Sequence, residues 1–283
     1  MTQARLAVAA ITIDFGNTLV RVDRPSLRAV VDHTADRLIA RGVVKDRAGF
    51  LTAWVEERDR QFREDVPEFR EPDINHRAVR VLARLRGMSA PAPDARWDDA
   101  AAGLHVAPGE IEEVIDAYSG EFVDRMRPVE DATATLQSLS GRGFRLAILS
   151  NWPLAVTIDR FAEAYGWLPY LRSIVVSQRV GLIKPHPAIF RSAETALGLT
   201  DADGPSIVHV GDDWAADVVG AHRAGWRTTF VRERQLDTPL PTSQPGDDLR
   251  TDATVEPDLI IDELGELPDL LDLAAVPAAP GTR

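Results

Sequence analysis

Acidic side chains follow apolar runs at two distant places in this sequence. Asp14 directly follows residues 6–13, and Asp212 and Asp213 follow a second apolar run, with Asp217 a helical turn further on. A carboxylate at the end of a strand is suited to act as a nucleophile or as a metal ligand. Several carboxylates gathered there would repel one another unless a cation joins them, and oxygen-only ligands indicate Mg²⁺ rather than Zn²⁺. The alternative at each position is a turn former or a helix cap.

Two further segments carry groups that could handle an anion. Ser150 and Asn151 follow another apolar run and could donate hydrogen bonds to a phosphoryl oxygen, although this pair is also common in loops. Lys184 precedes Pro185, which favours an extended backbone at the lysine. Lys45 and Lys184 are the only lysines, because almost all basic residues are Arg. A lysine kept against this bias indicates a need for a compact charge, and the alternative is an ordinary surface lysine.

The elements that must position these residues alternate along the chain. Continuous apolar runs predict buried parallel strands over residues 6–13, 144–149, 173–176, 206–210, 228–231 and 258–261. Between the first two runs, apolar residues at 27–39 and 111–123 follow helical spacing. We therefore predict an α/β fold, a doubly wound (Rossmann-like) parallel sheet core with an inserted helical cap domain. All four chemical segments then lie at carboxyl ends of strands, where open α/β sheets bind ligands.

The same patterns predict the domain limits. Residues 1–20 and 129–272 form the α/β hydrolase core, and residues 21–128 form the helical cap. Residues 236–256 are rich in Pro, Asp, Thr and Ser without an apolar period, which predicts a flexible loop within the core. Residues 273–283 are predicted to be a disordered tail.

In order, the four segments resemble the four motifs of the haloacid dehalogenase (HAD) superfamily. The motifs are Asp14-Phe15-Gly16-Asn17-Thr18, Ser150-Asn151, Lys184-Pro185 and Gly211-Asp212-Asp213 with Asp217. The resemblance covers roughly residues 6–20 and 129–272. The helical insertion resembles the type-one cap of that superfamily, but only in its position and helical character.

The resemblance implies a catalytic role for four residues. Asp14 would attack phosphorus and form an aspartyl-phosphate, and Ser150 and Asn151 would bind phosphoryl oxygens. Lys184 would offset the negative charge of the nucleophile and the phosphate. The implied enzyme is a Mg²⁺-dependent phosphatase that acts on a small phosphorylated metabolite.

The resemblance also implies a metal site. Asp212 would bind Mg²⁺ together with a carboxylate oxygen of Asp14 and the backbone carbonyl of Gly16. Asp213 and Asp217 would support this shell. These roles agree with the carboxylate chemistry above, since phosphoryl transfer depends on positioning and charge neutralisation.

Gly16 departs from the pattern of the family. Phosphatases of this family usually carry a second Asp two residues after the nucleophile, and such general acid-base help is worth about 10²–10⁴ in rate. The substrate could have a leaving group that needs no proton. Alternatively, the cap could supply the acid from Asp32, His33, Asp36 or His76, or the protein could be catalytically weak and act by binding.

Two other hydrolases of the family remain as alternatives. Haloacid dehalogenases also lack the second Asp, but they carry a bulky aromatic residue at that place and use no metal, unlike this chain with Gly16 and an acidic fourth motif. Phosphonoacetaldehyde hydrolase has a small residue there and needs a cap lysine for a Schiff base. Lys45 is the only candidate for that lysine.

Composition narrows the classes of partner. The 283 residues carry a net charge of −12, which disfavours nucleic acid and anionic membranes as partners. The absence of Cys excludes disulfides, thiolate zinc sites and a cysteine nucleophile. Neither a membrane-spanning apolar run nor a signal-peptide pattern is present, so we predict a cytoplasmic protein. The oligomeric state does not follow from the sequence.

Overall fold

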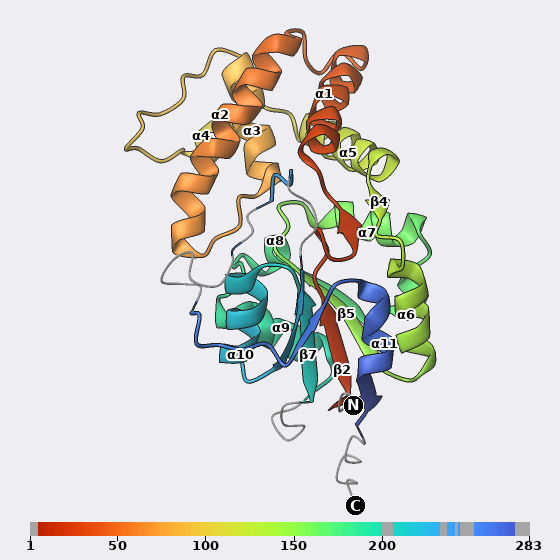
Figure 1. Ribbon diagram of the computed structural model, residues 1–283. Helices are drawn as coiled ribbons and strands as arrows, with labels where there is room; N and C mark the ends of the chain where they lie inside the picture. Colours follow the sequence, from red (N-terminus) through yellow and green to blue (C-terminus); the bar gives the residue numbers. More distant parts are fainter. Residues whose placement is uncertain (1–4, 200–205, 233–236, 241–242, 244–251, 275–283) are drawn as a thin grey trace, which may run out of the picture.

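A central parallel sheet organises the computed structural model, which describes residues 5–199, 206–232, 237–240, 243 and 252–274 (Figure 1). Its strands lie in the order β6-β5-β2-β7-β8-β9, and every neighbouring pair is parallel. The bounds are β2 Ala10–Ile13, β5 Arg145–Ser150, β6 Ser173–Val176, β7 Ile207–Gly211, β8 Arg227–Val231 and β9 Leu259–Ile261. Because β2 and β7 are buried at every residue, they need apolar runs rather than alternation. The predicted doubly wound α/β fold is confirmed.

Helices flank the sheet, and most of them connect one strand of the sheet to the next along the chain. They are α6 Ala132–Gly141, α7 Ala155–Ala164, α8 Ser177–Val180, α9 Pro187–Leu197, α10 Gly220–Arg223 and α11 Leu267–Leu270. Short 3₁₀ turns lie at η2 Leu168–Tyr170 and η5 Leu264–Glu266, and a π-helical turn, η4, spans Trp214–Val219. None of the helices in the described parts of the chain is long and apolar enough to cross a bilayer.

Strand register brings the chemical segments together. Ile13, the last residue of β2, pairs with Ile148 of β5 on one side and with Val210 of β7 on the other. The chain leaves β2 toward β5 and β6 and later returns to β7 on the opposite side, so β2 flanks the switch point of the sheet. Asp14 therefore emerges between the ends of two strands that carry the second and fourth motifs.

Five α-helices lie beyond the carboxyl ends of these strands (Figure 1). They are α1 Arg24–Ala40, α2 Arg47–Asp65, α3 Ile74–Leu85, α4 Asp99–Gly103 and α5 Pro108–Arg125, with a 3₁₀ turn at η1 Val66–Glu68. The helical patterns at 27–39 and 111–123 fall inside α1 and α5. The chain leaves and re-enters the sheet region through the antiparallel pair β3 Val20–Arg21 and β4 Arg127–Pro128. We call residues 24–125 the helical insertion.

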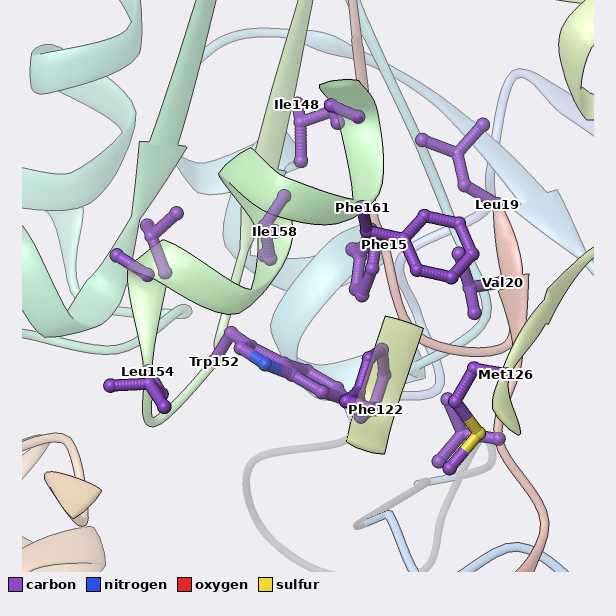
Figure 2. Close-up of a cluster of buried hydrophobic side chains, with 14 of the residues drawn as sticks. Phe15, Leu19, Val20, Phe122, Met126, Ile148, Trp152, Leu154, Ile158 and Phe161 are labelled. Atoms are coloured by element: carbon purple, nitrogen blue, oxygen red, sulfur yellow. The ribbon is translucent and has the colours of Figure 1, made fainter. Parts of the chain in front are cut away.

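An aromatic cluster packs this insertion against the sheet region (Figure 2). Phe122 of α5 lies 5.3 Å from Trp152 and 6.1 Å from Phe15, measured between ring centroids. Phe15 in turn contacts the Trp152 and Phe161 rings edge to face at 5.2 and 5.5 Å. Such pairs contribute about 0.5–1.5 kcal/mol each beyond area burial. Since Phe15 directly follows Asp14, this packing fixes the insertion close to the predicted nucleophile.

Two local predictions differ from the structure. Residues 6–13 are not one strand, because β1 (Leu6–Val8) pairs with β10 (Leu271–Leu273) in a separate small sheet. The chain steps between sheets at Ala9, where Ser206 O accepts from the N–H groups of both Ala9 and Ala10. The start of the predicted tail 273–283 is also ordered, since Leu273 belongs to β10 and Ala274 N–H donates to Val8 O at 2.9 Å.

The rest of the predicted tail, residues 275–283, lies outside the described residues, as does most of the predicted loop 236–256. The described part of that loop contacts the predicted site, as shown below.

Candidate active site

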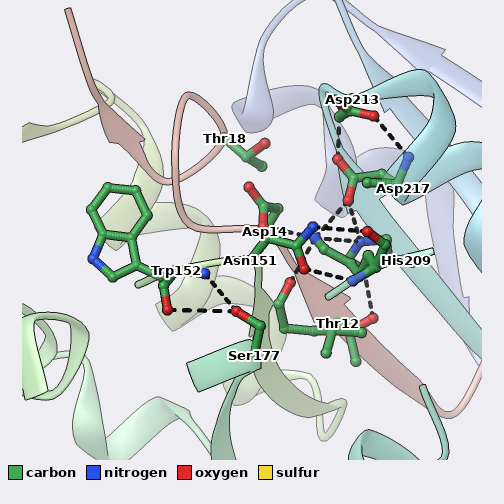
Figure 3. A network of polar contacts seen from close by, with 12 residues as sticks. Thr12, Asp14, Thr18, Asn151, Trp152, Ser177, His209, Asp213 and Asp217 are labelled. Carbon is green, nitrogen blue, oxygen red and sulfur yellow. Dashed lines mark hydrogen bonds and ion pairs between the residues drawn. The ribbon is translucent and has the colours of Figure 1, made fainter. Parts of the chain in front are cut away.

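The Lys184 ammonium is the centre of a buried polar network at the strand ends. Its Nζ donates to Asp14 Oδ1 at 2.8 Å, to Asp217 Oδ1 at 2.6 Å and to the Leu149 carbonyl at 2.9 Å. An ammonium has three donors, and all three are used. Three of the four predicted segments thus meet at one nitrogen, with the carboxylates drawn together in Figure 3.

Asn151 holds the backbone of Lys184 in place. Lys184 N–H donates to Asn151 Oδ1 at 2.6 Å, and Asn151 Nδ2 donates back to Lys184 O at 3.0 Å. The peptide bond between Lys184 and Pro185 is cis. Among the described residues, the Asn151 amide donates to Lys184 O alone, which leaves its second N–H for another acceptor. The predicted contact of Asn151 with a phosphoryl oxygen therefore stays a prediction, beside a positioning role that sequence reasoning missed.

His209 and Thr12 extend the network below Lys184 and were not predicted from the sequence. The two residues are paired across β7 and β2, and Thr12 Oγ1 lies 2.8 Å from His209 Nδ1. His209 Nε2 lies 2.9 Å from Asp217 Oδ1 and 3.4 Å from Lys184 Nζ. Because Nζ has no spare proton, we assign the imidazole N–H to Nε2, donating to Asp217, with Thr12 donating to Nδ1. The sequence did offer one signal for this contact, because His209 is a titratable residue inside an otherwise apolar strand.

The charges of this network follow from burial and pairing. Burial raises the pKa of Asp14, against the opposing charge of Lys184. Burial opposes the charged form of Lys184, yet the Asp14 and Asp217 carboxylates raise its pKa above the ordinary value. Burial also opposes ionisation of Asp217, but Lys184 and His209 lower its pKa below the usual range. Burial lowers the pKa of His209, so the imidazole is neutral at physiological pH.

The fourth motif folds back so that Asp217 reaches strand β7. Asp217 Oδ2 accepts from the Asp213 N–H at 2.9 Å within the π-helical turn η4. A Cβ placed on Gly211 would lie 2.2 Å from the same Asp217 oxygen, so only glycine leaves room for this carboxylate. Asp213 caps η4, where its Oδ1 accepts from Ala216 N–H at 2.7 Å. Burial and the Asp217 charge raise the pKa of Asp213 to about 6.

Asp14, Asp212 and Asp217 could hold a metal ion. One ligand oxygen of each lies within 4.8 Å of the others, and all three residues are buried. Asp217 already accepts from Lys184, His209 and the Asp213 backbone, which suits a supporting role. Among the contacts of the described residues, Asp14 accepts through Oδ1 alone. An all-carboxylate set of donors fits a hard divalent cation such as Mg²⁺.

Ser150 is a buried hydroxyl residue at the carboxyl end of strand β5. It ends β5, next to the strand that carries Asp14, and is 1% exposed. Its Oγ has no hydrogen-bond partner among the residues that the structure describes. A buried hydroxyl without a partner is costly, so a ligand oxygen would complete it. This placement fits the predicted contact with an anion.

The helical insertion also contacts the ends of the strands. Phe69 O accepts from Ile183 N–H at 2.9 Å, and Pro153 O accepts from Ile74 N–H at 3.0 Å. Glu71, between these two contacts, accepts a hydrogen bond from Ser177 Oγ. Burial raises the pKa of Glu71 to about 7. Sequence reasoning missed Glu71, because nothing in its local pattern marks it as a contact with the core.

The predicted cap acids are paired with other groups of the helical insertion. Asp32 and Asp36 bind Arg47 at 3.3 and 2.6 Å, and His33 lies 3.7 Å from Asp36 on the same exposed surface. The Arg47 hydrogen bond lowers the pKa of Asp36, which makes it a poor proton donor. His76 is exposed and lies 3.8 Å from Asp99.

Lys45 is exposed in the connection between α1 and α2. Helix α1 starts beside the first motif, so its 17 residues place Lys45 about 25 Å away along the helix axis. A Schiff-base lysine needs a desolvated site next to the substrate. This position removes the support for the phosphonoacetaldehyde hydrolase alternative.

Comparisons with known proteins agree with this geometry. A family model for haloacid dehalogenase-like hydrolases matches residues 8–225. The chain is 31% identical to ribulose-1,5-bisphosphate 5-phosphatase of Halopiger xanaduensis over 58% of this chain and 65% of the relative. It is 30% identical to glyceraldehyde 3-phosphate phosphatase of Methanopyrus kandleri over 60% of this chain and 67% of the relative. The matches thus span about two thirds of these relatives.

A solved structure shows the same fold. The 2-haloacid dehalogenase of Pseudomonas syringae pv. Tomato superposes with a TM-score of 0.61 over 93% of this chain and 97% of that chain. The two sequences are 22% identical. The likeness extends over the helical insertion as well as the sheet.

Proposed function

Since this chain belongs to the haloacid dehalogenase-like hydrolases, we propose that it is a Mg²⁺-dependent phosphatase of a small phosphorylated metabolite, with Asp14 as the nucleophile. One observation carries the proposal: the buried Lys184 ammonium joins the Asp14 and Asp217 carboxylates at the strand ends. The neighbouring strand β5 ends on Ser150, whose hydroxyl has no hydrogen-bond partner among the described residues. This arrangement offers a nucleophile, a fixed cation and a donor to one anionic group. The phosphatases among the relatives support the same class of substrate.

In the proposed reaction, Asp14 attacks phosphorus through its second carboxylate oxygen, because Lys184 holds Oδ1. A bond forms between Asp14 and phosphorus, and the bond from phosphorus to the leaving oxygen breaks. The leaving oxygen takes the bonding electron pair and later a proton from solvent. Ser150 and Lys184 stabilise the charge on the phosphoryl oxygens. Water then attacks phosphorus and releases phosphate and Asp14.

The chain's own carboxylates fit a metal at this place. Asp14, Asp212 and the Gly16 carbonyl would hold Mg²⁺, and Asp217 and Asp213 would support them. A bound Mg²⁺ supplies charge neutralisation to the phosphoryl group. His209 stays neutral and orients Asp217 through its Nε2–H, which keeps a second positive charge away from Lys184.

The acidic cluster also favours this proposal over a dehalogenase. Dehalogenases of the family use no metal, whereas here three buried carboxylates converge with one lysine between two of them. Three buried carboxylates beside one cation leave net negative charge, which a divalent ion would offset. Without a metal, this charge would oppose the approach of an anionic substrate.

A hydrolysis screen tests the proposal. The substrates are alkyl and aryl phosphates, acyl phosphates and 2-haloacids, each with Mg²⁺ and with a chelator. We expect phosphate release that needs Mg²⁺ and that Asp14→Asn abolishes, with unchanged circular dichroism, because an amide is nearly isosteric but cannot form the acyl phosphate. Halide release that persists in chelator would overturn the proposal in favour of a dehalogenase. Wild-type turnover by a folded Asp14→Asn would overturn the assignment of the nucleophile.

A further inference from the structure

The space beside Gly16 is filled by apolar groups from two distant segments. A Cβ placed on Gly16 would lie 2.4 Å from Leu240 Cδ1 and 3.3 Å from Trp152 Cζ3. Gly16 does not have a positive φ, so its backbone accepts other residues. A side chain at this position would therefore require the Leu240 methyl to move and the Trp152 ring to give way slightly. In the family's phosphatases this is the place of the second Asp.

Leu240 is held at this place by hydrogen bonds on its N-terminal side. Asn17 Nδ2, next to Gly16, donates to Thr238 Oγ1 at 3.0 Å, and the same Oγ1 accepts from Leu240 N–H at 3.2 Å. Arg24, at the start of α1, donates its backbone N–H to Asp237 O and its guanidinium to Thr238 O, both at 2.9 Å. Residues 237–240 are thus bound to the first motif and to the helical insertion.

Ser243 binds the opposite side of the site. Its carbonyl accepts from Trp214 N–H at 3.0 Å, and its hydroxyl donates to Asp213 Oδ1 at 2.8 Å. Ala215 N–H donates to the same hydroxyl at 2.8 Å. Through its described residues Thr238 and Ser243, the connection between β8 and β9 contacts both the first and the fourth motif. Hydrogen bonds at Thr238 and at Ser243, on either side of Leu240 in the sequence, therefore fix the backbone that carries this leucine.

We propose that Leu240 is a specificity-determining residue, which with Trp152 forms an apolar wall for the leaving group in place of a proton donor. This inference rests on the proposed phosphatase function. Trp152 is buried, and Leu240 is partly buried and packs on the same apolar core. A leaving oxygen at this wall meets no acid from Gly16. The substrate class that fits is an aryl or acyl phosphate, with an apolar leaving group of low basicity.

The wall also predicts how Gly16 and Leu240 depend on each other. In Gly16→Asp, the new side chain meets Leu240 at a distance that real Cβ atoms do not adopt, so one of them must move. Gly16→Asp alone should therefore restore little acid catalysis. The double variant Gly16→Asp/Leu240→Ala has room for the acid and should restore most of it.

The experiment compares two substrates of similar size and apolarity, phenyl phosphate and cyclohexyl phosphate. The phenolate is weakly basic and the cyclohexyl alkoxide is strongly basic. We expect wild type to favour phenyl phosphate by about 10²–10⁴ in kcat/KM, the factor that general acid catalysis supplies. Leu240→Ala should lower kcat/KM for both rings by about tenfold or more, through lost apolar contact. Its inhibition constant for inorganic phosphate, which has no leaving group, should not change.

The matched control is Leu104→Ala, which truncates an exposed leucine of the helical insertion. Circular dichroism and urea midpoints establish that each variant is folded. In Gly16→Asp/Leu240→Ala, the preference for phenyl phosphate should shrink by most of the acid-catalysis factor, and in Gly16→Asp it should stay close to wild type. Leu240→Ala kinetics equal to those of Leu104→Ala, or the same gain from Gly16→Asp with and without Leu240→Ala, would overturn the assignment of Leu240. Absence of Asp14-dependent hydrolysis in wild type would instead overturn the proposed function.

Discussion

Replacing Lys184 by Met should destabilise the protein strongly, because the ammonium holds two carboxylates together. Nζ contacts Asp14 Oδ1 and Asp217 Oδ1 at 2.8 and 2.6 Å, with all three side chains buried. Methionine has a similar length and no charge, so it fills the space but leaves the two acids facing each other. Removing one partner from a buried ion pair costs about 3–5 kcal/mol. Typical unfolding free energies are about 5–15 kcal/mol, so the loss is a large part of the total.

The chain provides its own control, because Lys45 is the only other lysine and is exposed. Urea unfolding at neutral pH in chelator, followed by tryptophan fluorescence, gives the unfolding free energy of wild type, Lys184→Met and Lys45→Met. We expect Lys45→Met to lie within about 0.5 kcal/mol of wild type. Equal urea midpoints for Lys184→Met and Lys45→Met, with unchanged slopes, would refute the electrostatic reasoning.

Two further predictions follow from the site. Asp212→Asn should weaken Mg²⁺ binding more than Asp213→Asn does, because Asp213 caps η4. Titration calorimetry measures both affinities, and equal losses of affinity would contradict the assigned ligands. The pKa of Glu71 is raised from 4.5 to about 7 in the folded protein. As pH rises between these two values, the Glu71 carboxyl loses its proton in the unfolded chain before it does in the folded protein. The unfolding free energy of wild type therefore falls as pH rises through this window. Glu71→Gln should therefore gain up to about 3 kcal/mol in unfolding free energy above the window and nothing below it, measured by urea unfolding across pH. The exposed control Glu68→Gln should stay flat. A flat Glu71→Gln profile would show that the folded protein does not raise the pKa of Glu71.

The strands and the convergence of the motifs could be predicted because both depend on local pattern and on sheet topology. Runs of apolar residues identify strands that are covered on both faces, and the prediction for β6 matches its observed bounds, 173–176. Once the strands are parallel, their carboxyl ends must share one edge of the sheet. The parallel arrangement alone therefore predicts that Asp14, Ser150 and Asp212 lie at the same edge of the sheet. The break at Ala9 could not be predicted, because residues on both sides of it are equally apolar.

The contacts that complete the site depend on tertiary structure. His209 lies in an apolar strand, and only its pairing with Thr12 places it under Lys184. Glu71 reaches Ser177 across 106 positions of sequence. Leu240 lies in a segment without hydrophobic period, where no local rule predicts that it fills the space beside Gly16. The sequence could therefore show that an acid is missing at Gly16 but not what stands in its place.

The central claim is that Asp14 carries the phosphoryl group during turnover. The direct measurement is a rapid acid quench of the enzyme while it hydrolyses phenyl phosphate with Mg²⁺, followed by proteolysis and mass spectrometry of the peptide that contains Asp14. Asp14→Asn, treated in the same way, is the control. We expect the wild-type peptide to gain the mass of one phosphoryl group, located on Asp14, and the Asp14→Asn peptide to gain none. Full turnover with the phosphoryl group found on another residue would contradict it.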